Sequence, residues 1–586
     1  MNVKSKSVIE KTFFSLLPVH IIMIIVSSIN SIIDEAIAAN FVGATSLAII
    51  ALFMPVIKGI DTINTVFLGG SQILCGQYIG KNQLKKSICV FSTDFFSIFI
   101  IGLAATVAGC CFSRPVAAIF VRDEALIQGL SGYIFGYSFG FLPSMFIPQL
   151  TAFLQIEHRE KRTYFGMGIM IFLNITLDIL FVTVCNLGMF GLGLATSLSY
   201  FAFFLVLVSY YFVGKPSLFF DIKQVCFKNL RDIVQVGFSG AVSQLSQTVR
   251  SALLNMILLT FVGNDGMSAF SAVYSFGCVF YATTGGISNA VRVLASIYVG
   301  EEDRAGLKAI MKTAVRKGTA LILTVSAVCM LCAPVFTRMF YGPAEGPVYN
   351  MTLMGFIIFP LTMPFSCICC TFGNYYQCLK RMGIVNILMF VDGLLGVVVF
   401  CYALVPLLGM NGIWIAHVFS GIFTLVVILI YTIVFNKRWP KSRDDFLTLS
   451  DDFGVLPENM LDIEITDMEN VINLSKTVVG FSKNHGVDRR RANIAGLCIE
   501  ELAGNIVKHG FDGKKDYSID VRIVYRQDEL LIRLRDNCRA FNPTEFVEMF
   551  SPEDISHNIG LRMVSKTSKS MSYNNCLRTN VLTIII

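Results

Sequence analysis

Long apolar stretches separated by short polar loops run from the N-terminus to about residue 440. A helix that crosses a bilayer needs about 20 consecutive, mostly apolar residues. Stretches of this kind predict twelve transmembrane helices, at 13–34, 47–72, 87–112, 128–150, 164–186, 189–213, 235–262, 267–293, 317–340, 350–373, 383–407 and 411–435. The pattern therefore predicts an all-α polytopic membrane domain over residues 1–440.

The apolar and turn patterns of the first half recur in the second half. "FVGATSLAIIALF" at 41 is echoed by "FVGNDGMSAFSAVYSF" at 261, "YIGK" at 78 by "YVGE" at 298, and "GMFGLGLATSLSY" at 188 by "GMNGIWIAHVFSG" at 409. The three spacings are nearly equal, which indicates two six-helix repeats, at about 10–214 and 231–436. An even number of helices per repeat predicts parallel repeats around a central cavity, a transporter architecture.

The pattern changes after Phe435, where charged residues become frequent. Residues 441–454 are interpreted as a linker. Beyond it, "MLDIEIT", "YSIDVRIVY" and "ELLIRLRDN" alternate as strands do, whereas 467–486 and 489–510 repeat apolar residues at helical spacing, with Gly486 as a helix end. We therefore expect a C-terminal α/β sandwich domain over residues 455–586.

Charge in the loops predicts the orientation of the helices. Lysine and arginine gather in the loops on one side, at 4–11, 81–86, 159–162, 215–231, 304–317, 380–381 and 437–443. The other side carries Arg114, Arg122 and Arg338. Because basic loops remain in the cytoplasm, we expect a multi-pass plasma-membrane protein with both termini, and hence the α/β domain, in the cytoplasm.

Composition agrees with this interpretation and excludes other classes. Hydrophobic residues make up 54% of the chain and charged residues 15%, whereas soluble domains carry roughly 25% charged residues. The net charge of +7 is explained by the basic loops, so no nucleic-acid partner is expected. The expected partners are the lipid bilayer and a small-molecule substrate.

One acidic side chain stands out inside the predicted helices. Asp178 is the only Asp, Glu, Lys or Arg in 164–214, and Asn174 lies one turn before it on the same helical face. Asp34 lies near the outer end of the first helix. Ionisable residues within spans are functional-site hypotheses by default. Their oxygen atoms suit Na⁺, and a desolvated carboxylate can also carry H⁺.

A structural role is the alternative for this carboxylate. Asp178 could pair with Lys58, or bond across helices, and simply hold its lobe together. The second repeat offers Asn386 and Asp392 at a different spacing. This asymmetry predicts an ion site in one lobe only.

The helical part resembles the multidrug and toxic compound extrusion (MATE) family over about residues 10–440. The resemblance rests on the two six-helix repeats and on "IIDEAIAANFVGATSLAIIAL", "GGSQILCGQYIGKNQLKKS" and "NITLD". It implies that Asp34, Asn174 and Asp178 form a cation site in the first lobe. In the family this site couples entry of Na⁺ or H⁺ to export of organic, often cationic, compounds.

Some residues depart from the family pattern. Ala39 stands where many relatives have glycine, and the predicted helices also contain Lys58, Asp61, Arg250 and Arg292. Buried arginines favour anionic ligands, which raises the question of a substrate that is not cationic.

The C-terminal part resembles the GHKL-type ATP-binding fold, in particular the anti-sigma-factor serine-kinase branch. Three motifs in order carry the resemblance, "CIEELAGNIVKHG", "RDNCRAFNP" and "HNIGLRMV", followed by a last strand "NVLTIII". Glu501 and Asn505 share one helical face in the first motif. By resemblance, Glu501 is the general base, Asn505 the Mg²⁺ ligand and Asp536 the residue that bonds adenine.

The third motif would supply the phosphate site. The resemblance places Gly560 and Leu561 at the start of a phosphate-binding helix, whose amides favour anions. It thus implies ATP and Mg²⁺ as cofactors and serine/threonine kinase activity. Three glycine or small positions of the motifs are changed, to Cys538, Ala540 and Asn558.

The first functional hypothesis is an antiporter driven by a Na⁺ or H⁺ gradient, with a cytoplasmic nucleotide-binding regulatory domain. No G-x-x-x-x-G-K-[ST] motif is present, so ATP is not expected to power transport. One alternative is a membrane-anchored sensor that phosphorylates or sequesters a cytoplasmic regulatory protein. Another is a flippase-type transporter of a lipid-linked or anionic substrate.

Overall fold

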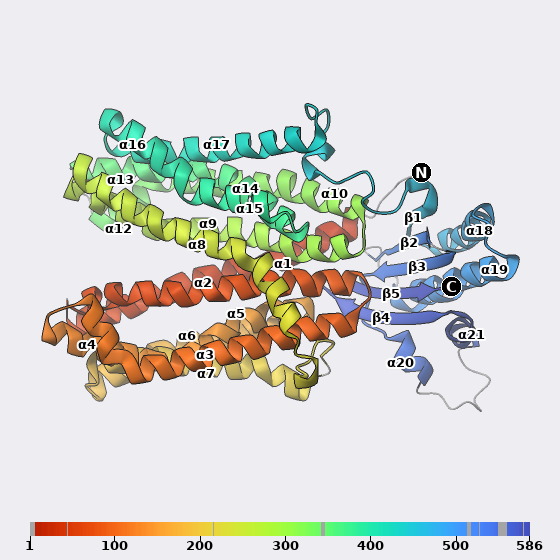
Figure 1. Ribbon diagram of the computed structural model, residues 1–586, viewed down its shortest axis with the longest axis horizontal. Coiled ribbons are helices and arrows are strands. Elements are labelled where there is room, and N and C mark those ends of the chain that lie inside the picture. Colours follow the sequence, from red (N-terminus) through yellow and green to blue (C-terminus); the bar gives the residue numbers. More distant parts are fainter. Residues whose placement is uncertain are drawn as a thin grey trace.

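The computed structural model describes residues 6–43, 45–214, 216–341, 346–511, 517–526, 528–548, 559–577 and 579–586. Two helical bundles lie side by side, and an α/β domain lies at one end of both (Figure 1). The bundles come together beside this domain and spread apart toward their other end (Figure 1). We call the first bundle the first lobe and the second bundle the second lobe.

The first lobe corresponds to the first predicted repeat. Its helices are α1 (Lys6–Ile37), α2 (Thr45–Gly80), α3 (Leu84–Phe120), α4 (Glu124–Ser138), α5 (Phe141–Ile156), α6 (Glu160–Ile179) and α7 (Gly188–Val213). The fourth predicted span is the broken pair α4 and α5, whose axes differ in direction by 46°.

The second lobe corresponds to the second predicted repeat. Its helices are α8 (Phe227–Phe261), α9 (Asn264–Gly300), α10 (Arg304–Thr313), α11 (Thr319–Leu331), α12 (Ala333–Tyr341), α13 (Pro347–Ile358), α14 (Met363–Cys378), α15 (Met382–Phe390), α16 (Gly396–Leu408) and α17 (Met410–Asn436). A 3₁₀ turn that contains Pro360 separates α13 from α14, because proline cannot donate the hydrogen bond that a continuous α-helix needs.

Three π-helical turns interrupt the spans close to acidic residues. They lie at Ala38–Val42, just after Asp34; at Leu180–Val184, just after Asp178; and at Val391–Leu395, which contains Asp392. Such turns often occur at functional sites. They place the carboxyl groups where the regular helical pattern is broken.

The number of clearly apolar spans is lower than the predicted twelve. By length and composition, nine helices in the described part of the chain could cross a membrane, or ten if the bent pair counts as one span. α8 and α9 are 35 and 37 residues long but are not among the nine. α8 is rich in serine and glutamine and α9 in glycine and serine, which lowers their mean hydropathy.

The α/β domain contains the three strands and two helices expected from its sequence, with further elements. Its elements are β1 (Met460–Ile465), α18 (Met468–Asn484), α19 (Arg489–Cys498), β2 (Ile519–Arg526), β3 (Glu529–Asp536), α20 (Pro543–Glu548), α21 (Ile559–Thr567), β4 (Ser570–Cys576) and β5 (Thr579–Ile585). Gly486 follows α18 with a φ of 77°, which is the left-handed conformation expected at a helix end.

The five strands form one antiparallel sheet in the order β1-β2-β3-β5-β4. Alternate residues of β2 and β3, such as Val521 and its partner Leu534, are buried against α18 and α19 in an apolar core. The residues between them, such as Arg522 and its partner Arg533, belong to the opposite face, which lies against the helical body.

Candidate functional site

A cavity of about 380 Å³ lies within the first lobe. Its walls are formed mainly by α1, α2, the α4–α5 pair and α7, and Asp34 is one of its lining residues. Asn30 lies one turn before Asp34 and donates a hydrogen bond from Nδ2 to its Oδ2 (3.3 Å). Tyr133, Tyr137 and Tyr200 line the same cavity. The cavity is thus lined by carboxyl, amide and tyrosine side chains together with apolar residues of the same helices.

The three residues expected to bind a cation lie on two helices. Asp34 is on α1, and Asn174 and Asp178 are on α6. The side chains of Asp34 and Asp178 lie close enough to influence each other electrostatically. Like charges on neighbouring carboxylates disfavour the state in which both are ionised. A proton or a cation bound beside them would relieve this repulsion.

Asn174 and Asp178 are fully buried, with relative exposures of 0%. Neither polar atom of the Asn174 side chain, and neither oxygen of Asp178, has a conventional hydrogen-bond partner among the described residues. Native proteins rarely leave buried polar groups unsatisfied, so each such group calls for an explanation. Three oxygens and one amide nitrogen on one face of α6 are therefore unsatisfied among the described residues.

The structure contradicts the ion-pair alternative for Asp178. Lys58 pairs instead with Asp61, one turn later on α2, at 3.5 Å between Nζ and Oδ2. Both of these side chains remain nearly half exposed and line the cavity. The expected structural partner of Asp178 is thus engaged elsewhere.

The second lobe has its own cavity, of about 330 Å³, with a different charge. Arg250 on α8 lines it, and its guanidinium donates to the Asp392 backbone carbonyl (3.4 Å) and to the Tyr274 hydroxyl (3.5 Å). Asp392 and His417 also line this cavity. Asp392 thus lies beside an arginine in this cavity.

Asp94 on α3 is a further buried carboxylate, which was not among the predicted site residues. Its side chain has a relative exposure of 0%. With its amide oriented to satisfy its neighbours, Gln149 donates to Asp94 Oδ2 (3.3 Å) and accepts from the Leu68 N–H (3.1 Å). Asp94 is an isolated acid within the predicted span 87–112, and that signal could have identified it.

The structure brings together parts of the three nucleotide motifs in the α/β domain. A methyl group added at Gly560 would lie 1.8 Å from Glu501 Oε2, so this carboxylate lies directly against the start of α21. A methyl group added at Gly510 would lie 3.2 Å from Cys538 Sγ. The end of the first motif therefore lies beside the turn that follows Asp536.

The remaining residues of this site differ in exposure. Asn505 is exposed, whereas Leu561 is 5% exposed and belongs to the apolar core. Asp536 Oδ1 accepts hydrogen bonds from the Cys538 N–H (2.9 Å) and from Asn580 Nδ2 (2.7 Å). Burial raises the pKa of Asp536, and these two bonds oppose the rise. Asn558 lies outside the described residues.

Comparison with known proteins identifies the helical body. The family model MatE matches residues 18–180 and 240–402, one segment in each lobe. The "Probable multidrug resistance protein YoeA" of Bacillus subtilis (strain 168) is 25% identical over 362 residues, which cover 57% of this chain and 73% of that protein. The "Probable multidrug resistance protein NorM" of Photorhabdus laumondii is 24% identical over 213 residues, 35% of this chain and 46% of that protein.

Solved structures show the same fold. An outward-facing multidrug resistance MATE family transporter of the MOP superfamily superposes with a TM-score of 0.67 at 21% identity, covering 72% of this chain and 94% of that one. A MOP superfamily transporter from Pyrococcus furiosus superposes with a TM-score of 0.68 at 20% identity, covering 75% and 97%. Two family matches, one in each lobe, and this shared fold show that the chain belongs to the MATE family of multidrug efflux transporters.

Proposed function

We propose that this protein is an antiporter that couples the entry of Na⁺ or H⁺ to the export of small organic compounds. The observation that carries the proposal is the buried pair Asn174 and Asp178 on one face of α6, whose polar atoms have no hydrogen-bond partner in the described part of the chain, with Asp34 of α1 as a close neighbour. Buried carboxylates without a compensating charge are electrostatically unfavourable. Cation binding would therefore stabilise whichever conformation holds these groups together.

Coupling follows from this difference between conformations. A ligand shifts an equilibrium only by its differential affinity for the two states. A cation that binds the closely spaced carboxyl pair more tightly in one state favours that state, and rocking of the lobes then carries the substrate across. Asp34 is on α1, and α1 and α2 line the cavity of the first lobe. The ion and the substrate would therefore act on the same lobe.

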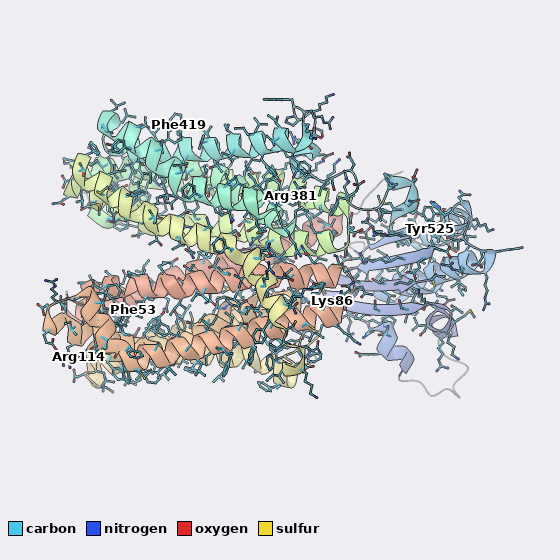
Figure 2. The ribbon with its side chains drawn as sticks, in the orientation of Figure 1. Phe53, Lys86, Arg114, Arg381, Phe419 and Tyr525 are labelled. Atoms are coloured by element: carbon cyan, nitrogen blue, oxygen red, sulfur yellow. The ribbon has the colours of Figure 1, made fainter. Side chains whose placement is uncertain are left out.

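We further propose that all twelve predicted segments cross the membrane and that the α/β domain is cytoplasmic. Lys86, from a basic loop, lies beside the sheet, whereas Arg114 lies at the far end of the body (Figure 2). Basic loops thus occupy the end that carries the domain, as the positive-inside rule requires. α8 and α9 would cross with their polar faces turned toward the other lobe.

A second candidate substrate class is supported by Arg250. Arg250 donates to a carbonyl and a hydroxyl and has the acid Asp392 beside it in the cavity. An anionic or lipid-linked substrate would bind this guanidinium in competition with Asp392. Cationic compounds would instead bind the acidic cavity of the first lobe.

The full-length protein in proteoliposomes, given either an H⁺ or a Na⁺ gradient, tests the transport proposal. We expect one of the two gradients to drive counter-transport of a cationic dye, and no transport without a gradient. Transport of an anionic dye in its place would favour the second substrate class. Failure of either gradient to move either dye would contradict the proposed coupling.

We also propose that the α/β domain binds ATP with Mg²⁺ and regulates transport. The position of Glu501 against the start of α21, and of the first motif beside the turn after Asp536, supports this assignment. Mg²⁺ is usually held by substrate phosphates, water and one or two side chains, so the exposed amide of Asn505 fits it. Phosphoryl transfer to a cytoplasmic protein, with Glu501 as base, would make the chain a membrane-anchored regulator as well.

Replacing Asn505 with alanine is expected to weaken binding of ATP–Mg²⁺ to the full-length protein by at least about tenfold, because a hydrogen bond or metal contact to a charged ligand is lost. Titration with a fluorescent ATP analogue measures the effect. Asn473→Ala, at an exposed position on α18, is the matched control and should bind normally. If the wild-type protein does not bind the analogue, the nucleotide proposal is wrong.

A further inference from the structure

Three arginines of the α/β domain lie on the sheet face that is turned away from α18 and α19. Arg522 on β2, and Arg533 and Arg535 on β3, are each only 7% exposed. A strand face with arginine at alternate positions is normally solvated. Here the helical body covers it, so these charges must be compensated by partners in the two lobes.

The second lobe supplies the acidic partners. Glu301, just after α9, accepts from Arg535 (2.5 Å, Nη2 to Oε1) and lies 3.4 Å from Arg533 Nη1. Asp303, just before α10, pairs with Arg522 (2.6 Å, Nη1 to Oδ1). Arg535 also donates to the Tyr298 hydroxyl (2.7 Å) and stacks over its ring. The end of α9 is thus held by β2 and β3 together.

The first lobe is bonded to the same sheet. Arg533 Nη2 donates to the carbonyl of Gly80, the last residue of α2 (3.1 Å). Asn82 donates to the Ser572 hydroxyl on β4 (2.6 Å), and the Leu577 N–H donates to the carbonyl of Ile156, the last residue of α5 (3.1 Å). One antiparallel sheet therefore bridges both lobes.

The two lobes are in close contact with each other next to the sheet. A methyl group added at Gly80 would lie 2.1 Å from the carbonyl oxygen of Ile297, and one at Gly300 would lie 2.2 Å from that of Gln77. Gln77 Nε2 also donates across the seam to the carbonyl of Cys378 on α14 (2.7 Å). α2 and α9 are thus in backbone contact at the end of the body that carries the sheet (Figure 1).

Opening this end requires Gly80 to separate from Gly300. The sheet is hydrogen-bonded throughout and cannot stretch, so separation must break its contacts with one lobe. Loss of the second-lobe set would separate Glu301 from Arg533 and Arg535, and removing one partner of a buried ion pair is unfavourable. Loss of the first-lobe set would break the hydrogen bonds to the Gly80 and Ile156 carbonyls and between Asn82 and Ser572. The closed arrangement and the bound domain therefore stabilise each other.

We propose that the C-terminal domain is an autoinhibitory clamp, which binds both lobes at their touching ends and must release one of them before the cavity can open on that side. The inhibition of transport by the clamp rests on the proposed transport function. The effect of the domain contacts on the open–closed equilibrium of the lobes does not depend on it. Ligands or proteins that favour release would activate transport.

The experiment measures maleimide labelling of the native Cys378 in the full-length protein in nanodiscs, followed by peptide mass spectrometry. Cys378 has a relative exposure of 0%, lies at the seam between the lobes, and donates from Sγ to the Arg292 carbonyl. It should react only when the lobes separate. Glu301→Gln is expected to accelerate labelling at least about tenfold, because Arg533 and Arg535 lose their shared carboxylate.

Arg526→Gln is the matched control. Arg526 is also on β2 and also pairs with an acid of the second lobe, Glu302 (2.8 Å), but its side chain is 62% exposed. Exposed pairs contribute little, so labelling should be unchanged. If Glu301→Gln does not fold, the neutral double variant Asn82→Ala/Ser572→Ala removes a bond to the first lobe and should accelerate labelling by a smaller factor.

Labelling at the wild-type rate in a folded Glu301→Gln protein would overturn the clamp. Faster labelling together with faster dye transport under the same gradient would establish autoinhibition. Faster labelling in a protein that moves no dye, in the wild type or the variants, would support the clamp and contradict the transport proposal. The experiment can therefore contradict the clamp proposal and the transport proposal independently of each other.

Discussion

Replacing Asp178 with asparagine is expected to reduce ion-driven transport by roughly 5- to 150-fold, the range of typical coupling free energies. Asparagine has nearly the same shape, so the fully buried position should stay packed. It cannot carry the negative charge that binds Na⁺ or exchanges H⁺, and it no longer repels Asp34. The conformational equilibrium should then respond only weakly to the ion gradient. Dye counter-transport in proteoliposomes measures the loss.

Asp94→Asn is the matched control for this variant. Asp94 is equally buried in the same lobe, but it bonds to Gln149 and is not one of the residues expected to bind the cation. The variant should retain the response to the ion gradient. Wild-type coupling in Asp178→Asn would refute the proposed ion site. Equal losses in both variants would point to a general intolerance of this lobe to charge removal.

Replacing Gly70 with alanine is expected to open the seam between the lobes. The added methyl group would lie 2.0 Å from the carbonyl oxygen of Ile233 on α8, closer than real Cβ atoms approach any backbone oxygen. Overpacking of this kind costs roughly 1–3 kcal/mol, about 5- to 150-fold in the ratio of closed to open protein. The labelling rate of Cys378 should rise accordingly.

Gly59→Ala separates this effect from the general effect of alanine in a helix. Gly59 is also on α2, but an added methyl group there meets no atom within 4 Å. Labelling of Cys378 should stay at the wild-type rate in this control. If Gly70→Ala labels no faster than Gly59→Ala, the tight contact of α2 with α8 does not hold the lobes closed.

Most elements of the fold follow from local patterns in the sequence. Apolar runs of membrane-spanning length located the helices, and a recurring spacing located the two lobes that MatE matches separately. The alternation in "ELLIRLRDN" located β3. These features depend on residues a few positions apart, because helical and strand periodicity are properties of the local backbone.

The placement of Asp178 and Asn174 on one helical face could be predicted from local sequence in the same way, since residues four apart share a face. The proximity of Asp178 to Asp34 was inferred by resemblance and needed the packing of α1 against α6 to be seen. The sequence also suggested Lys58 as a partner for Asp178, and this was wrong because Lys58 pairs with Asp61 within its own helix. Competition between a near and a distant partner cannot be judged from spacing alone.

The sequence by itself determined that the chain has a polytopic helical membrane body, a C-terminal domain with a sheet and a carboxylate inside the first lobe. Only the tertiary structure decided what the polar face of that sheet does. The sequence pattern predicts an ordinary solvated strand face for Arg522, Arg533 and Arg535. It places Glu301 and Asp303 in a charged loop. Their pairing joins residues more than 200 positions apart. Such contacts follow from where the domain docks, which no local pattern records.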